Sequence, residues 1–254
     1  MFGKNRIILK SPQEIEILRV ANALVMEILL TLKEEVKPGK STYEFEERAL
    51  ELCEKKGVKP AFKGYRGYPY ALCISVNEEI VHGMPRKDKI LREGDIVSFD
   101  FGVIYEGYYG DAALSVGVGK ISELAERLLK TTEEALNLAI EKARIGNKIG
   151  DISFAIQSRV EREGFNVIRD FVGHGIGRSL HEPPEVPNYG RPGRGPKLEA
   201  GMVLAIEPMV SAGSWEVEIL EDGWTAVTKD RSLACHFEHS IAITSSGPKI
   251  LSKI

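Results

Sequence analysis

The stretch GDIVSFDFGVIYEGYYGDAA, residues 94–113, decides the fold because it reads as two strands joined by a tight turn. Val97, Phe99 and Phe101 share one face of the first strand, and Asp100 lies on the other. If Tyr105-Glu106 is a two-residue turn, position 104 pairs with 107 and Asp100 stands directly opposite Asp111. The Cβ atoms of the two aspartates would then lie ~5 Å apart.

Two carboxylates that face each other repel, so a fold tolerates them when a shared proton or a bound cation compensates. The alternative is a pair of solvated surface aspartates. The apolar residues that flank Asp100 and Asp111 on both strands make this alternative the weaker one. The hairpin therefore predicts an acidic pair that binds a proton or a cation.

Helical patterns come before the strands in two segments of the chain. Ser11-Pro12-Gln13-Glu14 predicts the start of a helix that ends at Pro38-Gly39, and a second helix starts at Ser41 or Thr42 and ends at Gly57. The same apolar pattern returns 107 residues later, where the matching glycines are Gly146 and Gly164. We interpret the chain as one catalytic domain, 1–254, with two related halves, about 1–115 and 116–254. Two unrelated helical hairpins would also look alike.

Strand patterns cluster after each pair of helices and do not alternate with them. This arrangement favours an α+β fold with mainly antiparallel strands and with helices on one face. Stretches rich in Gly and Pro predict loops at 59–70 and 182–197. The segments with strand-like alternation are 71–76, 79–82, 95–104, 107–118, 202–210, 215–220, 224–228 and 233–244.

Composition and charge exclude several classes of protein. A net charge of −3 argues against a nucleic-acid partner, which would favour clustered Lys and Arg. No apolar run of about 20 residues is present, so no membrane association is expected. The three cysteines are odd in number and widely spaced, which predicts no disulfide framework and a reducing, cytoplasmic location.

Further candidate site residues lie in the second half. His174 and His181 are seven residues apart in the glycine-rich stretch GHGIGRSLHEPP, 173–184. This spacing differs from that of a helical zinc site, so the two histidines are expected to have different roles; two structural loop histidines are the alternative. Glu207 and Glu238 each lie within an apolar strand, where an acid is costly unless it is paired or metal-bound.

The candidate ligands are therefore four carboxylates and one imidazole. This set has too many acids for one zinc ion, which usually takes three protein ligands at a catalytic site. Oxygen-rich ligation with one nitrogen suits two divalent ions that share bridging carboxylates, and Co, Mn, Fe and Zn all accept such ligands. The ligands would be Asp100, Asp111, His174, Glu207 and Glu238.

Five segments, in order along the chain, resemble the methionine aminopeptidases of the short bacterial type, the smallest of the pita-bread metallopeptidases. The resemblance covers nearly the whole chain and implies the pita-bread fold. It also implies a monomer whose substrates are the N-termini of nascent polypeptides, with transient ribosome association. The segments are CISVNEEIVHGMP (73–85), GDIVSFDFGVIYEGYYGDAA (94–113), GHGIGRSLHEPPEVPNYG (173–190), GMVLAIEPM (201–209) and HFEHSIAIT (236–244).

The resemblance also implies a role for each ligand. Asp100 would chelate one metal ion, and Asp111 and Glu238 would bridge both ions. His174 and Glu207 would complete the shell of the second ion. Glu207 is in addition a candidate carrier of a proton to the leaving amine.

By the same resemblance, His82 and His181 match the two non-ligand histidines of the family, which contact substrate and stabilise the tetrahedral intermediate. Phe62 and Leu180 depart from residues found in some relatives, and this puts the detailed shape of the methionine pocket in doubt. The residues that match the lining of that pocket are Tyr65, Tyr68, Cys73 and Trp224.

The expected reaction is removal of an N-terminal methionine when the second residue is small. A water between two cations loses a proton more easily, with a pKa towards ~7, and the hydroxide attacks the first peptide carbonyl. His181 would donate a hydrogen bond to the oxyanion or the adjacent amide, worth on the order of 3 kcal/mol.

Two other functions compete with this one. A prolidase or an aminopeptidase P shares the five ligands, but such enzymes usually carry an additional N-terminal domain, for which 254 residues leave no room. A pita-bread binding protein without catalytic activity would typically have lost ligands, and all five are present here.

Overall fold

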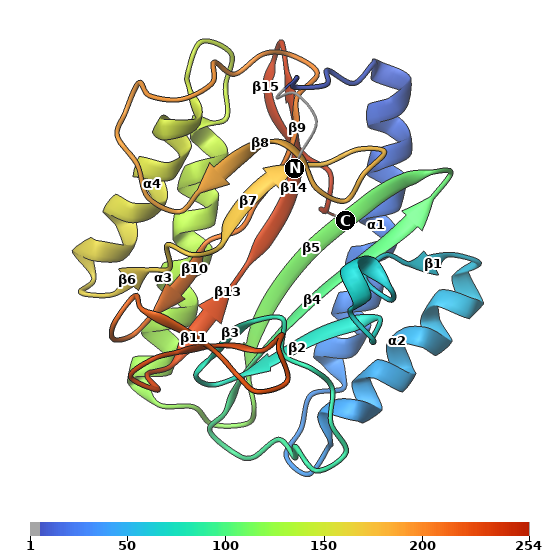
Figure 1. The fold of residues 1–254 in the computed structure, drawn as a ribbon, viewed down its shortest axis with the longest axis vertical. Helices are drawn as coiled ribbons and strands as arrows, with labels where there is room; N and C mark the ends of the chain where they lie inside the picture. Colours follow the sequence, from blue (N-terminus) through green and yellow to red (C-terminus); the bar gives the residue numbers. More distant parts are fainter. Residues whose placement is uncertain (1–5, 254) are drawn as a thin grey trace.

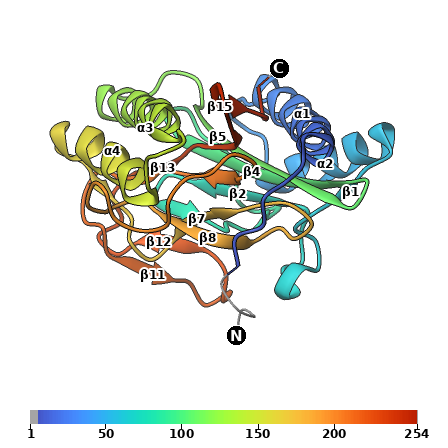
Figure 2. The same ribbon diagram turned by 90° about the horizontal axis from the view of Figure 1, so that it is seen from above.

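The computed structural model describes residues 6–253, in which two pairs of helices cover one face of an antiparallel sheet (Figure 1). Figure 2 shows both pairs on the same side of the sheet, with β7 and β8 on the opposite side of the molecule. The predicted α+β arrangement is therefore observed. The helices are α1 (Pro12–Glu34), α2 (Thr42–Lys56), α3 (Glu123–Lys142) and α4 (Ile149–Arg162).

Serine caps start the first two helices, as the sequence predicts. Ser11 accepts a hydrogen bond from the backbone N–H of Glu14, whose side chain accepts one from Ser11 N. Ser41 and Glu44 form the same capping box on α2, which ends at Gly57 in the left-handed region. The charged outer faces of these helices fit a position at the surface, and within residues 6–253 no helix has the length and apolar character that a membrane span needs.

The central sheet has nine strands, and its neighbouring strands pair in antiparallel directions. Seven strands follow the order β1-β4-β5-β14-β9-β7-β8, while β2 pairs with β4 and β15 with β14. Their bounds are β1 (Lys59–Pro60), β2 (Leu72–Val76), β4 (Ile96–Tyr105), β5 (Tyr108–Gly117), β7 (Val172–Gly175), β8 (Glu182–Pro187), β9 (Val203–Ile206), β14 (Glu238–Thr244) and β15 (Gly247–Ile250).

Two small three-stranded sheets complete the structure. One has the order β13-β10-β6 and the other β11-β12-β3. A short 3-10 helix, Tyr65–Gly67, lies in the first predicted loop. The strands are β3 (Glu79–Val81), β6 (Asn166–Val167), β10 (Met209–Ser211), β11 (Val217–Ile219), β12 (Ala226–Thr228) and β13 (Ala234–His236).

The predicted register of the β4–β5 hairpin is wrong by two residues. Tyr105 pairs with Tyr108, so the turn residues are Glu106 and Gly107, and both have positive φ angles of 49° and 79°. A tight hairpin turn with two left-handed residues favours glycine, which explains its position at Gly107. Asp100 therefore lies opposite Ala113 and not opposite Asp111. Because a shift of two residues keeps each side chain on its face, both aspartates still share one face.

Three other predicted boundaries also differ from the structure. The predicted strand 202–210 divides at Glu207-Pro208, and the strand 233–244 divides at Phe237. Pro208 has no N–H to continue the ladder, which accounts for the first break. The predicted loop 182–197 begins with β8, whose prolines are tolerated because β8 is at the end of the sheet order.

The apolar core lies between the helices and the sheet. One cluster packs α1 and α2 against β4, and a second packs α3 and α4 against β9 and β14. Phe99 on β4 is fully buried, and its ring lies 5.0 Å from the ring of Phe45 on α2. The residues that alternate with Asp100 along β4 thus form the helix-facing side of the sheet.

Phe99→Ala should lower the free energy of unfolding by ~3–5 kcal/mol, because it leaves a cavity in the core. The control is Phe154→Ala, the same change at a side chain that is 45% exposed, and its cost should stay below ~1 kcal/mol. Denaturant unfolding of both variants measures the difference. Equal costs for the two variants would contradict the packing described here.

Candidate metal centre and adjoining pocket

The face of the sheet that points away from the helices carries the predicted acids in rows across neighbouring strands. Asp100 pairs with Ala113, which pairs with Glu238 on β14, so the three residues form one row. Asp111 is two residues from Ala113 and shares its face. Ala113 has a small side chain, which leaves space above it between the two acids.

His174 enters the same face from β7. It pairs with Ala205, and Ala205 pairs with Ser240, so small residues again separate the functional side chains. His174 Nε2 lies 3.8 Å from Asp111 Oδ2 and 3.5 Å from Glu207 Oε1. Ligand atoms of Asp111, His174 and Glu238 all lie within 4.8 Å of one another. Asp111, His174 and Glu238 thus form the compact centre of the group, and all five predicted ligands line one cavity.

Burial of this cluster shifts every pKa in it. Burial raises the pKa of Asp100 to about 7. Burial, followed by the charges of neighbouring carboxylates, raises the pKa values of Asp111, Glu207 and Glu238 well above the usual range. Burial lowers the pKa of His174 to about 4. The site therefore disfavours the charged form of each group until an opposite charge joins it.

The hydrogen bonding of the carboxylate oxygens in this cluster indicates whether divalent ions would fit here. Asp100 Oδ1, Asp111 Oδ1 and Glu238 Oε1 are buried and have no hydrogen-bond partner. A buried carboxylate oxygen without a partner is costly, and a bound cation would satisfy it. Because carboxylate oxygens and one imidazole are ligands that divalent first-row ions accept, the residues present fit such ions.

A cavity of about 310 Å³ adjoins the cluster, and all the predicted site residues line it. Tyr68 is buried, and its hydroxyl proton can be donated to the carbonyl of Leu72 at 3.1 Å or to that of Gly83 at 3.2 Å. The ring of Trp224 packs edge-on against Tyr68 at 5.1 Å. Cys73 pairs with Asp100 across β2 and β4, which places the thiol beside the acids. Phe62 and Leu180, the two departures from the family pattern, also line this cavity.

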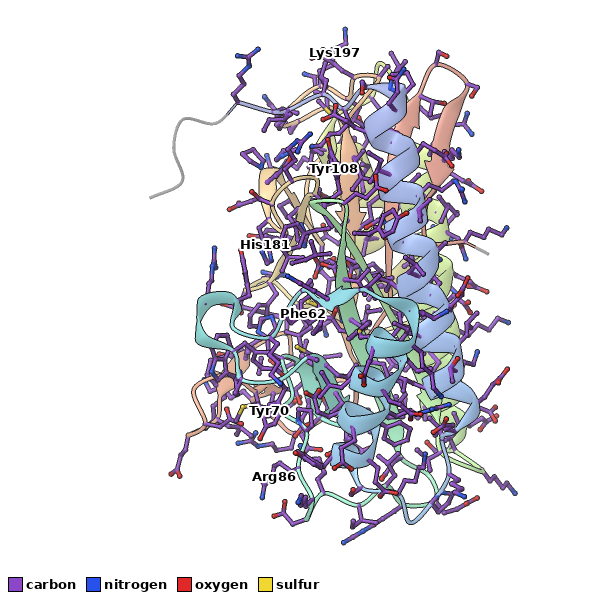
Figure 3. The ribbon with its side chains drawn as sticks, turned by 90° about the vertical axis from the view of Figure 1, so that its right-hand side faces the viewer. Phe62, Tyr70, Arg86, Tyr108, His181 and Lys197 are labelled. Carbon is purple, nitrogen blue, oxygen red and sulfur yellow. The ribbon has the colours of Figure 1, made fainter. Side chains whose placement is uncertain are left out.

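The two non-ligand histidines lie on irregular backbone at the edge of the cavity. His82 follows β3 and has a φ of 59°, a left-handed conformation that is strained for this residue and is typical of functional sites. His181 lies in the loop between β7 and β8, and its Nδ1 is 2.8 Å from the hydroxyl of Tyr65. Figure 3 shows His181 and Phe62 on the side of the β4–β5 hairpin away from α1.

Three residues near the site were not predicted from the sequence. His236 is buried, and its Nε2 lies 3.8 Å from Glu207 Oε2 without a hydrogen-bond partner. Phe171 packs edge-on against His82 at 5.3 Å, and Met209 lines the cavity with it. A signal for His236 was present, because it lies two residues before Glu238. Nothing in their local patterns distinguishes Phe171 or Met209 from core residues.

The fold and the cluster of metal-binding side chains are those of a metal-dependent peptidase. Metallopeptidase family M24 matches residues 16–245, and the chain belongs to this family. The chain is 54% identical to the methionine aminopeptidase of Clostridium perfringens, over 98% of this chain and 99% of that protein. The crystal structure of methionine aminopeptidase from Thermotoga maritima superposes with a TM-score of 0.96 at 53% identity, over 98% of this chain and 100% of that one. These relatives confirm the resemblance described above.

A prolidase from Pyrococcus furiosus shares the fold at a TM-score of 0.79 and 25% identity. The match covers 97% of this chain but 66% of the prolidase. This neighbour and the methionine aminopeptidases confirm the predicted pita-bread fold.

Asp100→Asn should stabilise the metal-free protein increasingly as the pH rises. The pKa of Asp100 is about 7 in the folded state against an ordinary 3.8, so its contribution to stability is complete below 3.8 and is lost as the pH rises through about 7. The asparagine stays neutral, so its advantage should grow over this window by ~1.4 kcal/mol per pH unit for each proton by which the two folded states differ. Thermal unfolding of chelator-treated proteins from pH 4 to 8 measures this difference.

The buried histidines are common to both proteins. Loss of the Asp100 charge lowers the pKa values of Asp111, Glu207 and Glu238, which adds to the trend in the same direction. Glu216→Gln, a change at an exposed acid, is the control and should show no such trend. A difference between Asp100→Asn and the unchanged chain that stays constant over the whole range would disprove the assigned burial of Asp100.

Proposed function

We propose that this chain removes the N-terminal methionine from nascent polypeptides whose second residue is small. The observation that carries the proposal is the full-length similarity to methionine aminopeptidases, at 54% identity. The acidic cluster and the apolar cavity beside it support the proposal, because a peptidase of this kind needs a place for the reacting carbonyl and a place for the side chain.

We propose that Asp100, Asp111, His174, Glu207 and Glu238 hold two divalent ions, with Co, Mn, Fe and Zn as the candidates. Bound ions of this type lower the pKa of water towards ~7 and polarise a carbonyl oxygen, which makes hydrolysis feasible at neutral pH. The unpaired oxygens of Asp100, Asp111 and Glu238 support this assignment. Asp111 and Glu238 would be shared by both ions.

His181 would act on the carbonyl oxygen of the first residue. A Tyr65 hydroxyl that donates to Nδ1 leaves the ring proton on Nε2, which can then donate to an oxyanion. His82, which lines the same cavity, would contact the substrate near its second residue. Glu207 Oε1 lies 3.5 Å from His174 Nε2, and Glu207 would carry a proton to the leaving amine.

The cavity composition supports selection of methionine. Tyr65, Tyr68, Cys73 and Trp224 offer aromatic and sulfur surfaces that suit a flexible thioether. A charged side chain would be buried without a partner there and should be rejected.

The alternatives have less support. The prolidase neighbour is 25% identical and considerably longer than the matched region. A binding protein without activity would not need three buried, unpaired carboxylate oxygens at the floor of a cavity. Ribosome association, a monomeric state, a cytoplasmic location and the origin of the chain from two related halves stay predictions.

Asp111→Ala should abolish methionine release while the protein stays folded, because it removes a ligand shared by both ions. Loss of a residue that only orients a ligand typically costs ~10–100-fold, so loss of the ligand should exceed ~100-fold. Release of methionine from Met-Ala-Ser measures the effect, with circular dichroism to check the fold. The control is Asp88→Asn, at an aspartate whose side chain is 70% exposed. Near-normal turnover by folded Asp111→Ala would refute the ligand assignment.

A panel of peptides tests the proposed reaction directly. Met-Ala-Ser and Met-Gly-Met should be cleaved far faster than Met-Lys or Met-Phe peptides. A bulky second residue would displace the scissile carbonyl, and a displacement of ~1 Å can cost on the order of 100-fold. N-acetylated Met-Ala-Ser should resist cleavage because it lacks a free amine. The assay uses metal-stripped protein with each divalent ion added back in turn.

Two outcomes of this panel would change the assignment. Comparable rates for Met-Ala and Met-Phe peptides would remove the selectivity for small second residues. Faster cleavage of Xaa-Pro peptides than of Met-Ala-Ser would favour the aminopeptidase P alternative.

A further inference from the structure

A buried ion pair lies behind the loop that carries His181. Lys10 Nζ is 2.6 Å from Glu182 Oε2, and their side chains are only 3% and 6% exposed. The two residues are 172 positions apart in the chain. Glu182 directly follows His181 in the chain, so the Lys10–Glu182 ion pair restrains the backbone next to His181.

The same pair also organises the rest of this loop. Glu182 Oε1 accepts a hydrogen bond from the backbone N–H of Ser179 at 3.2 Å. A Cβ atom added to Gly177 would lie 2.6 Å from both Glu182 Oε1 and Lys10 Cε. The loop backbone is therefore packed closely onto both members of the pair, and a side chain at position 177 would separate them.

Lys10 is itself firmly held. Its N–H donates to the carbonyl of Gly201 at 2.7 Å, and its ammonium also donates to the carbonyl of Ile8. The next residue, Ser11, caps α1. Figure 2 shows the chain before α1 running alongside the sheet, and the ion pair joins this segment to the first residue of β8. A fixed segment of the chain thus reaches the loop.

The energetics of buried ion pairs show that stability alone does not explain this one. Desolvation of two charges commonly cancels their attraction, and apolar or neutral replacements of similar volume are often neutral for stability. The geometry around Lys10 and Glu182 suggests a different benefit, which is one fixed conformation for a loop of glycines and polar residues. Such a loop would otherwise have many conformations available.

We propose that Lys10 is a positioning residue, which through Glu182 fixes the loop backbone so that the His181 ring stays against Tyr65 and faces the reacting carbonyl. The proposal rests on the proposed function to the extent that His181 acts on substrate. The Tyr65 hydroxyl holds the ring at 2.8 Å, and the ion pair holds the neighbouring residue of the backbone.

The decisive variant is the double change Lys10→Met/Glu182→Gln. It removes both charges at nearly constant volume, and it keeps an oxygen that can accept the hydrogen bond from Ser179. We expect a melting temperature close to that of the unchanged chain, and a kcat for Met-Ala-Ser that falls by on the order of 10–100-fold with little change in KM. The matched control is Lys40→Met/Glu35→Gln, at an ion pair just beyond the C-terminal end of α1, which should leave kcat unchanged.

The same double change made in the His181→Ala protein distinguishes positioning of the His181 ring from a general structural effect. In a His181→Ala chain the double change should cause no further loss of kcat, because the ring that it positions is absent. An equal loss in both backgrounds would show that the effect does not pass through His181 and would overturn the proposal. A folded double variant with unchanged kcat would also overturn it. Should the double variant not fold, Glu182→Asp replaces it, because it keeps both charges but shortens the acid by one methylene, and the same fall in kcat is expected.

A readout independent of activity separates this proposal from the proposed function. The chain has five histidines, so their ring resonances can be resolved by NMR and that of His181 identified by its loss in His181→Ala. The double variant should shift or broaden this resonance and leave that of His239 unchanged. If the His181 resonance of the double variant is the same as in the unmutated protein, the positioning role is overturned. If the unmutated protein releases no methionine from any peptide, only the proposed function is overturned.

Discussion

Burial of like charge on one face of the sheet is the constraint on which the rest of this structure depends. Asp100, Asp111 and Glu238 lie on neighbouring strands, with oxygens that no hydrogen bond satisfies. Repulsion and desolvation both oppose this arrangement, so other interactions must hold it. The hydrogen-bonded ladder does so, because the position of each acid is fixed by its strand register. Ala113 then leaves room between the acids for whatever compensates their charge.

The same alternation that exposes the acids to the site also supplies the core. On β4, Asp100 points to one side while Phe99 and Phe101 point to the other and are fully buried. The helices cover that apolar side, and the energy of burying it stabilises the face that carries the charges. Core and site are therefore two sides of one strand pattern, and a register shift by one residue would destroy both.

This two-sided pattern explains what the sequence could predict. Helix caps, the alternating strands and the five candidate ligands depend on residues close in the chain, and their periodicity can be read directly. The hairpin register depended on which residues take positive φ, and Glu106 gave no sign that it would do so. The closeness of His236 to Glu207 and the pairing of Lys10 with Glu182 arise from tertiary packing alone. No local pattern encodes contacts between residues so far apart.

The site thus combines two kinds of support. The candidate ligands Asp100, Asp111 and His174 lie on strands, where the ladder determines their geometry. His82 and His181 lie on irregular backbone, which permits the approach to substrate that a flat strand cannot offer but provides no ladder to hold them. Each must be fixed by contacts from elsewhere, such as Phe171 against His82 and the Tyr65 hydroxyl on His181. The precision of the strand-borne part of the site is therefore set by the sheet, and that of the loop-borne part by side chains distant in sequence.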